Sequence, residues 1–255
     1  MIELEERGNI ALLNMAHGKV NLMDVEFCNA VTKHFEMLET SSFQAVILTG
    51  KGKAFSAGVD LSRALDEGTS YMDVFFPAML RMFEKVFFFP KPVLAAINGH
   101  AIAGGCVLAC GTDYRIMADG GGKIGIPELL VGVPFPTIAL EIMRFNALPQ
   151  HFHGLVYGGT TYSVQDAAHL GLINEIVSSP DLISHAIKTA EKMATIPVAT
   201  FQITKKQMRL PIMERVKAAQ ADIGPVVQKL WSSPEILDAI RRYVSQALKK
   251  TKDGS

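Results

Sequence analysis

The chain has 255 residues, 49% hydrophobic and 20% charged, which is enough apolar material for a sizeable core in one or two domains. Basic and acidic residues number 25 each, and no basic run exceeds two residues, so nothing points to a nucleic-acid partner. The N-terminal stretch lacks a hydrophobic signal core, and no apolar run reaches the ~18–20 residues of a membrane span. We therefore expect a cytoplasmic protein without a membrane partner.

The three cysteines, Cys28, Cys106 and Cys110, are odd in number and form no C-x-x-C pair. Neither a disulfide framework nor a zinc site is indicated, and buried thiols in a reducing compartment are expected. No histidine pair has the helical spacing of a metal site, so we expect no metal. His151 and His153 follow a proline and are interpreted as loop residues.

Strand, turn and helix patterns alternate along the first two thirds of the chain. Alternating apolar positions around Gly8 predict a hairpin, and 45–50 reads as a buried strand. Helical spacing predicts a helix over 24–39, capped by Asp24. The later expected elements are a helix over 71–89, a strand over 93–98, a helix opening at Gly104, a strand over 114–118, a strand-and-turn unit from 123, a helix over 136–147, a helix–strand unit over 163–177, and helices from about 181 onward.

Two adjacent glycines, Gly104 and Gly105, interrupt the long apolar run that starts at Val93. A strand that runs into a glycine-led helix can bind an anion, because the first backbone N–H groups of a helix have no internal partner. The natural donor is the N–H of Gly104. Close packing of the helix on the strand would explain the glycines equally well, so the stretch alone leaves both interpretations open.

A second glycine turn lies in Ala57-Gly58-Val59-Asp60, after the strand over 45–50. Two strand-end turns that each present an N–H to one cleft would form a two-donor oxyanion hole. Glu128 lies in an almost entirely apolar run, so it is either exposed or has a pKa raised by burial.

Four segments resemble the crotonase family, also called enoyl-CoA hydratase/isomerase: AVILTGKGKAFSAGVDL, KPVLAAINGHAIAGGCVLACGTDYRIMAD, KIGIPELLVGVP and GGTTYSVQDAAHLGLINEIV. They occur in the family's order, and the resemblance covers roughly residues 1–250. It implies an α/β fold, a superhelix of β-β-α units with a C-terminal helical trimerisation region. The spiral core with the acyl-CoA site would span 1–195 and the helical region 196–255. The resemblance also implies a homotrimer or a dimer of trimers.

The resemblance further implies a coenzyme A thioester substrate and no separate cofactor. By residue-to-residue match, the oxyanion-hole donors are the N–H groups of Val59 and Gly104, and Glu128 is the catalytic carboxylate. Lys19 matches the segment along the coenzyme's nucleotide end and could meet a phosphate, although a solvated lysine is an equal alternative. The implied substrate-contacting residues are Lys19, Ala57, Val59, Asp60, Leu61, Gly104, Val107 and Phe135.

The chain departs from the hydratases of the family at Val107. Those enzymes resemble one another in carrying two glutamates; the second matches Glu128, but the first falls on Val107. Valine cannot move a proton, and hydration suits two carboxylates. We therefore favour isomerisation of a 3-enoyl-CoA to a 2-enoyl-CoA through an enolate. The alternatives are a hydratase that uses a single glutamate and a non-catalytic acyl-CoA-binding homologue.

Several other residues are assigned simpler roles. Asp60 is expected to cap the helix that begins near Leu61. Asp66 and Glu67 could replace the missing carboxylate, but solvent is favoured for both. His100 could border the pocket, although a packed or hydrogen-bonded ring is favoured. Two further residues are expected to be structural, Asp113 at a turn before a strand and Trp231 in helix packing.

Overall fold

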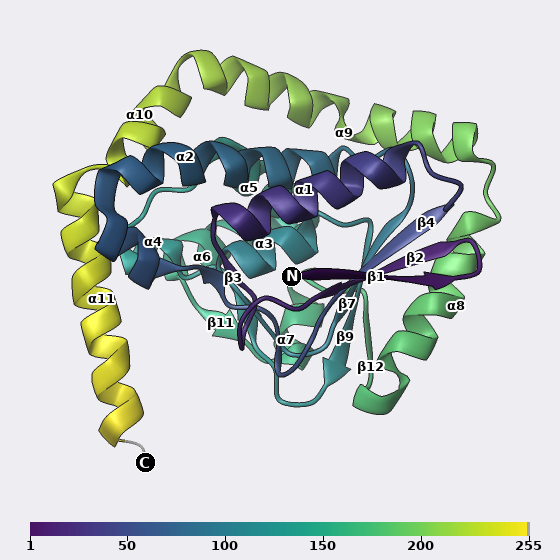
Figure 1. Cartoon of the computed structure of the whole chain (residues 1–255), viewed down its shortest axis with the longest axis horizontal. Coiled ribbons are helices and arrows are strands. Elements are labelled where there is room, and N and C mark those ends of the chain that lie inside the picture. Colours follow the sequence, from purple (N-terminus) through teal and green to yellow (C-terminus); the bar gives the residue numbers. More distant parts are fainter. Residues whose placement is uncertain (254–255) are drawn as a thin grey trace.

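The computed structural model describes residues 1–253, and the side chains of residues 1–246 (Figure 1). Its main feature is a six-stranded sheet of order β1-β2-β4-β7-β9-β12. The strands are β1 (Ile2–Arg7), β2 (Ile10–Met15), β4 (Ala45–Gly50), β7 (Val93–Ile97), β9 (Tyr114–Asp119) and β12 (Glu175–Ser178). β1 and β2 form the predicted antiparallel hairpin, and every later pair in this sheet is parallel.

Short strands pair with one another in two smaller sheets. They are β3 (Leu22–Met23), β5 (Ala54–Ser56), β6 (Gly58–Val59), β8 (His100–Ile102), β10 (Ile124–Gly125) and β11 (Thr161–Tyr162). β5, β8 and β10 join β11 in a four-stranded sheet, and β3 pairs with β6. Since β2, β4, β7 and β9 are each followed by one or two short strands and then a helix, the predicted repetition of β-β-α units is confirmed.

The helices are α1 (Val25–Glu39), α2 (Leu61–Phe87), α3 (Gly104–Cys110), α4 (Glu128–Val131), α5 (Thr137–Asn146), α6 (Pro149–Gly158), α7 (Val164–His169), α8 (Leu182–Ala194), α9 (Val198–Ala221), α10 (Ile223–Trp231) and α11 (Pro234–Asp253), with a 3-10 turn over Ser179–Asp181. Side chains alternate between the two faces of the large sheet. Leu13 and Leu48 face the main core, while Leu12 and Ile47 face α8, whose small residues Ala186 and Ala190 are buried against that side. The sheet therefore lies between α8 and the remaining core helices (Figure 1).

Local sequence signals explain several helix boundaries. The Asp24 side chain accepts a hydrogen bond from the N–H of Phe27 at 2.7 Å, so the predicted cap of α1 is confirmed. Ser163 caps α7 in the same way. The helix expected over 71–89 is the second part of α2, which begins at Leu61 and is interrupted at Gly68, where φ is 65°.

The loop interpretation of His151 and His153 was wrong, because both lie in α6. Pro149 is the first residue of this helix, a position where its missing N–H has no intrahelical acceptor and its fixed φ suits the helix. Among the described residues, no group of three or more histidine, cysteine, aspartate or glutamate side chains could hold a metal ion. No helix within residues 1–253 combines the length and apolar character needed to cross a bilayer.

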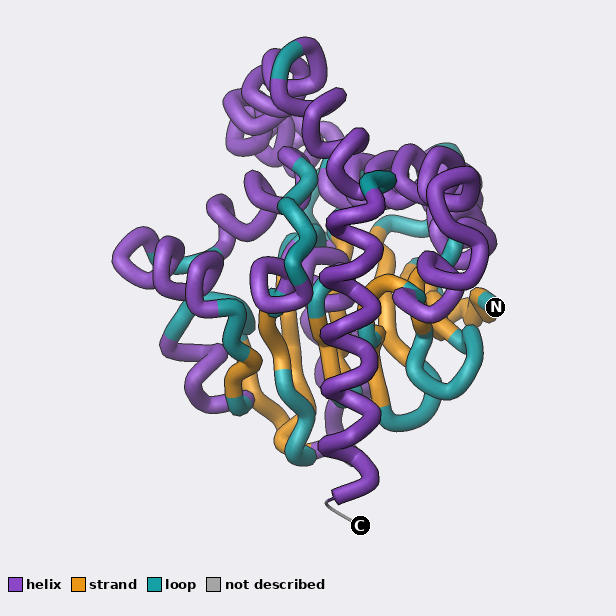
Figure 2. Tube along the Cα trace, turned by 90° about the vertical axis from the view of Figure 1, so that its left-hand side faces the viewer, coloured by secondary structure: helices purple, strands orange, loops and turns teal. Residues whose placement is uncertain are grey.

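The C-terminal helices wrap around the core. In Figure 1, α9 runs along the top and α11 descends the left side, and Figure 2 shows α11 crossing in front of the strands. Asp113 holds α9 in place: its carboxylate accepts hydrogen bonds from the N–H of Val93 at 2.8 Å, from Lys205 at 2.6 Å and from Arg209 at 2.8 Å. The division at residue 195 and the role of 196–255 in trimerisation remain predictions.

Candidate active site

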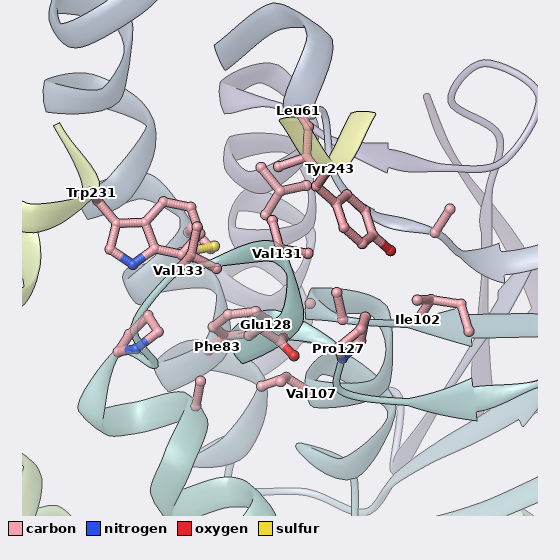
Figure 3. Close-up of a pocket in the computed structure, with 17 residues that line it drawn as sticks. Leu61, Phe83, Ile102, Val107, Pro127, Glu128, Val131, Val133, Trp231 and Tyr243 are labelled. Carbon is pink, nitrogen blue, oxygen red and sulfur yellow. The ribbon is translucent and has the colours of Figure 1, made fainter. Parts of the chain in front are cut away.

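A cavity of about 90 Å³ lies between the β-β-α spiral and the C-terminal helices (Figure 3). Its lining consists of Ala57, Val59, Leu61, Met79, Phe83, Ile102, Ala103, Gly104, Val107, Pro127, Glu128, Val131, Val133, Pro136, Ala139, Trp231 and Tyr243. The two glycine turns and the glutamate that the sequence singled out thus meet at one place. The C-terminal helices contribute to the lining as well, because α10 supplies Trp231 and α11 supplies Tyr243.

The two glycine turns are in direct contact. Gly58 has a φ of 86°, and a Cβ there would lie 2.8 Å from the carbonyl oxygen of Ile102 and 3.3 Å from the backbone nitrogen of Gly104. Both the backbone conformation and the close approach therefore require glycine. Ala103, just before α3, also has a positive φ of 53°, which is unusual for a residue with a side chain. The backbone is thus held in an uncommon conformation where the turns meet.

Two backbone N–H groups stand out as candidate hydrogen-bond donors. Gly104 is the first residue of α3, so its N–H has no partner within the helix. Around Val59, the N–H of Gly58 donates to the Ser56 hydroxyl at 3.2 Å and the N–H of Asp60 donates to the Met23 carbonyl at 3.0 Å. Val59 itself lines the cavity between them. This arrangement suits a two-donor oxyanion hole.

The second glycine of the pair has a packing role. A Cβ on Gly105 would lie 2.2 Å from the carbonyl oxygen of Ser56, so α3 could not approach β5 with any side chain there. At Gly104 the nearest atom would be the Sδ of Met23 at 2.8 Å, the end of a flexible side chain. The packing interpretation therefore applies to Gly105, whereas Gly104 lines the cavity and its role as a donor remains a prediction.

Glu128 is the first residue of α4 and is buried, with 7% of its surface exposed. Burial raises the pKa of its carboxyl group from 4.5 to about 8, opposed only in part by a hydrogen bond to its own backbone. Its Oε2 has no hydrogen-bond partner within the described part of the chain. A buried acid with a free oxygen and a pKa near neutrality is suited to exchanging a proton with a ligand.

The surroundings of Glu128 are apolar. Figure 3 shows the carboxyl group directed into the cavity beside Val107, and Val107 is 1% exposed. Asp66 and Glu67, the possible replacements for a second carboxylate, are exposed, and Glu67 pairs with Arg63 at 2.6 Å. Among the lining residues that the structure describes, Glu128 is the only carboxylate.

Three of the expected substrate contacts lie outside the lining. Asp60 caps α2, as expected, by accepting a hydrogen bond from the N–H of Arg63 at 3.0 Å. Phe135 packs half-buried against the core, while its neighbours Pro136 and Val133 reach the cavity. Lys19 is exposed, and its proposed contact with a coenzyme phosphate remains a prediction.

His100 lies away from the cavity and accepts a hydrogen bond from the N–H of Lys123 at 3.1 Å. Sequence reasoning did not anticipate that Tyr243 and Trp231 line the cavity. Trp231 is 3% exposed and packs as expected, and its indole edge is part of the cavity wall as well. Neither residue belongs to a motif, and an amphipathic helix gives no signal about which cavity its apolar face will cover.

Comparisons with known proteins show the family to which the chain belongs. The model of the enoyl-CoA hydratase/isomerase family matches residues 5–248, so the chain belongs to this family, whose fold is the crotonase fold. The chain is similar to enoyl-CoA delta isomerase 1, mitochondrial, of Rattus norvegicus, with 30% identity over 88% of this chain and 78% of the relative. It is also similar to a putative enoyl-CoA hydratase of Thermus thermophilus, with 29% identity over 79% of this chain and 81% of the relative.

Among solved structures, that of human mitochondrial delta3-delta2-enoyl-CoA isomerase superimposes with a TM-score of 0.91 over 98% of both chains, at 24% identity. At this identity the likeness concerns the fold, and the predicted α/β spiral with a helical C-terminal region is confirmed. Acyl-CoA thioesters are the substrates of the family. The relatives include isomerases and hydratases, so the choice of reaction depends on the residues of this cavity.

Proposed function

We propose that the protein isomerises 3-enoyl-CoA thioesters to 2-enoyl-CoA thioesters. The observation that carries the proposal is the pairing of a single buried carboxylate, Glu128, with an apolar residue, Val107, at the position where the hydratases of the family resemble one another in having a second glutamate. Moving a double bond needs one group that removes and returns a proton, whereas adding water needs a water molecule to be oriented and deprotonated as well.

The oxyanion hole would bind the thioester carbonyl. Its oxygen accepts hydrogen bonds from the N–H groups of Val59 and Gly104, and both bonds strengthen as negative charge develops on the oxygen. Removal of one such donor typically costs about 10²–10³ in rate. Because both donors are backbone groups, the side chain at position 59 has little direct effect on this step.

The proton transfers would then use Glu128 alone. Its carboxylate removes a proton from C2, and the electron pair of that C–H bond becomes part of an enolate that extends over C1 to C4. The double bond shifts from C3–C4 to C2–C3 when the carboxylic acid delivers the proton to C4. No atom is gained or lost, and the acid returns to its ionised form. A pKa near 8 supports both directions of transfer, and the apolar walls favour exclusion of water.

Two alternatives remain as outcomes of the test. A hydratase with Glu128 alone would accumulate 3-hydroxyacyl-CoA from a 2-enoyl-CoA, and the hydratase names among the relatives keep this candidate open. A non-catalytic homologue would bind acyl-CoA without turnover. The deciding experiment is incubation with 3-enoyl-CoA and 2-enoyl-CoA, with products resolved by mass and retention time.

Isotope transfer and one variant pair sharpen this experiment. With deuterium at C2, an isomerase that uses a single carboxylic acid should carry part of the label to C4. Glu128→Gln should abolish isomerisation while the fold is retained, whereas Glu67→Gln, at an exposed position, should keep full activity. Unchanged turnover in Glu128→Gln would remove this residue from the mechanism.

We also propose assembly into a homotrimer or a dimer of trimers. Exposed apolar side chains concentrated on α9 and α10 support an interface there: Val198, Ile203, Met208, Leu210, Ile223, Val226 and Leu230. Sedimentation equilibrium would test the mass, and a monomer at micromolar concentration would contradict the proposal. The cytoplasmic location remains a prediction, since one of the similar relatives is a mitochondrial protein.

A further inference from the structure

The two ends of the cavity differ in the residues that line them. Figure 3 shows Ile102 at one end and Trp231 at the other, with Glu128 between them. Ile102 lies two residues before Gly104, so the thioester carbonyl would be held at that end. Carbons C2 to C4 must reach Glu128 for the proton transfers described above. The rest of the acyl chain then extends toward Trp231, which stands where the chain would end.

Trp231 is fixed in place by two different contacts. Its indole N–H donates a hydrogen bond to the carbonyl oxygen of Pro134 at 2.8 Å, and its ring packs on Phe76 with a centroid distance of 5.8 Å. Phe76 is itself 3% exposed. A buried indole whose N–H is satisfied and whose face is covered cannot rotate away without losing both contacts. It therefore forms a rigid end wall.

A second cavity lies behind this wall. It has a volume of about 150 Å³ and is lined by residues that include Phe76, Leu80, Thr137 and Val227, at the junction of α2, α5, α9 and α10. Pro136 lines both cavities. Phe76 packs on Trp231 and also lines the second cavity. Phe76 and Pro136 thus form a partition between the two cavities, which a longer acyl chain could otherwise occupy one after the other.

We propose that Trp231, held by Pro134 and backed by Phe76, sets the maximum acyl-chain length and restricts the enzyme to short acyl chains. This proposal rests on the proposed function, because it assumes that an acyl-CoA occupies the cavity. A space of about 90 Å³ holds on the order of six to nine water-sized groups. Since the thioester carbonyl oxygen takes the place of one of them, the space corresponds to acyl chains of roughly five to eight carbons. Longer chains would have to displace the indole.

The test is a chain-length series. Measured kcat/KM for 3-hexenoyl-, 3-octenoyl-, 3-decenoyl- and 3-dodecenoyl-CoA should rise by roughly fourfold for each methylene that the cavity buries. It should fall by about tenfold or more once the chain exceeds the cavity, because the longer chain must displace the indole from its contacts with Pro134 and Phe76. In Trp231→Ala, the ratio of kcat/KM for the twelve-carbon substrate to that for the six-carbon substrate should rise by about tenfold or more, since the space vacated by the indole becomes available to the chain. Trp231→Phe keeps most of the wall and should change this ratio much less.

Two further measurements keep the test decisive. Phe152→Leu shortens a buried aromatic residue of α6 that lines neither cavity, and it should leave the ratio unchanged. Binding of saturated acyl-CoAs, followed by calorimetry, gives the length profile even if the reaction is hydration, and Trp231→Leu replaces Trp231→Ala if the latter does not fold. Equal kcat/KM and equal affinity for six and twelve carbons in the unmodified protein would overturn the role of Trp231. A lack of turnover and binding at every length would instead overturn the proposed function.

Discussion

The backbone nitrogen of Gly104 lies close to Gly58: a Cβ added at Gly58 would be only 3.3 Å from it. One glycine comes from the turn after β5 and the other from the turn after β8, and β5 and β8 are paired in parallel. The sheet register therefore brings the two turns together. The close approach of the two turns is a property of this pairing rather than of either turn alone.

Gly58→Ala should reduce kcat by about 10²-fold or more, because the added methyl displaces a donor of the oxyanion hole. The matched control is Gly121→Ala. Both residues have a positive φ, 86° at Gly58 and 78° at Gly121, but a Cβ at Gly121 would meet nothing within 4 Å. The shared φ should cost each variant about 1 kcal/mol of stability, and only Gly58→Ala should lose activity. Equal activity in both variants, measured at saturating substrate, would contradict the role of this turn.

The activity should depend on the ionisation of Glu128. Since burial raises its pKa to about 8, the carboxylate that removes the C2 proton is a minor form at pH 6. We expect kcat/KM to increase about tenfold per pH unit below the pKa and to level off above about pH 8. A profile measured from pH 5.5 to 9.5 that is flat below pH 7 would show that a different group limits the reaction.

Ionisation of Glu128 should lower the stability of the folded protein as the pH rises, whereas it should increase the activity. The pKa of Glu128 is higher in the folded protein than the ordinary 4.5, so the folded state binds more protons between pH 4.5 and about 8. Its contribution to the free energy of unfolding is therefore present below pH 4.5 and is lost as the pH rises toward 8. Each pKa unit corresponds to about 1.4 kcal/mol, which limits the loss to about 5 kcal/mol.

Glu128→Gln removes this titration, so its stability relative to the unmodified protein should increase from pH 5 to pH 8.5. Urea unfolding at the two pH values measures the difference, and other titrating groups cancel in the comparison. A difference between the two proteins that does not change with pH would mean that the carboxyl group is ionised in the folded state throughout.

Val107→Glu should introduce the second carboxylate that the cavity lacks. We expect the ratio of hydration to isomerisation products to rise by about tenfold or more, because a second acid–base group can orient water. Val107→Gln is the matched control, as it has the same size without the charge. Both variants bury a polar group beside Glu128 and should lose stability, so the product ratio is the informative measurement, and equal ratios would argue against the proposed division of roles.

Asp113 should be critical for stability. Its carboxylate neutralises Lys205 and Arg209, whose side chains are 7% and 4% exposed. Asp113→Asn keeps the shape but leaves two buried cations without this counter-charge, which should cost about 3–5 kcal/mol. Asp238→Asn removes the partner of Arg241 in an exposed pair and should cost about 0–1 kcal/mol. Denaturant unfolding of both variants compares the two environments, and similar costs would contradict the argument.

Much of the spiral could be predicted from local patterns. The central strands β4 and β7 are buried, mainly apolar runs, and caps such as Asp24 and Ser163 mark where α1 and α7 begin. Most short strands were missed because two or three residues carry too little pattern, and their pairing depends on distant partners. Chain topology also decides which residues face the cavity: Phe135 and Pro136 are adjacent, yet only Pro136 lines it.

Val59, Gly104 and Glu128 could be brought together from the sequence because each depends on a local signal, a glycine turn or a charge in an apolar run. Their roles as donors and acid remain predictions. Trp231 and Tyr243 could not, because they reach the cavity only through the docking of α10 and α11 on the spiral. The raised pKa of Glu128 was one of two options at the outset, and the structure supports it because the side chain is buried.

The position of Tyr243 in α11 has a consequence for how the cavity is closed. The two glycine turns and Glu128 lie within residues 57–128, whereas Trp231 and Tyr243 of the lining come from α10 and α11. The same apolar space is therefore built from two distant parts of the chain. Undocking of α10 and α11 would open it, with Glu128 inside, to solvent, even if every residue of the spiral kept its place.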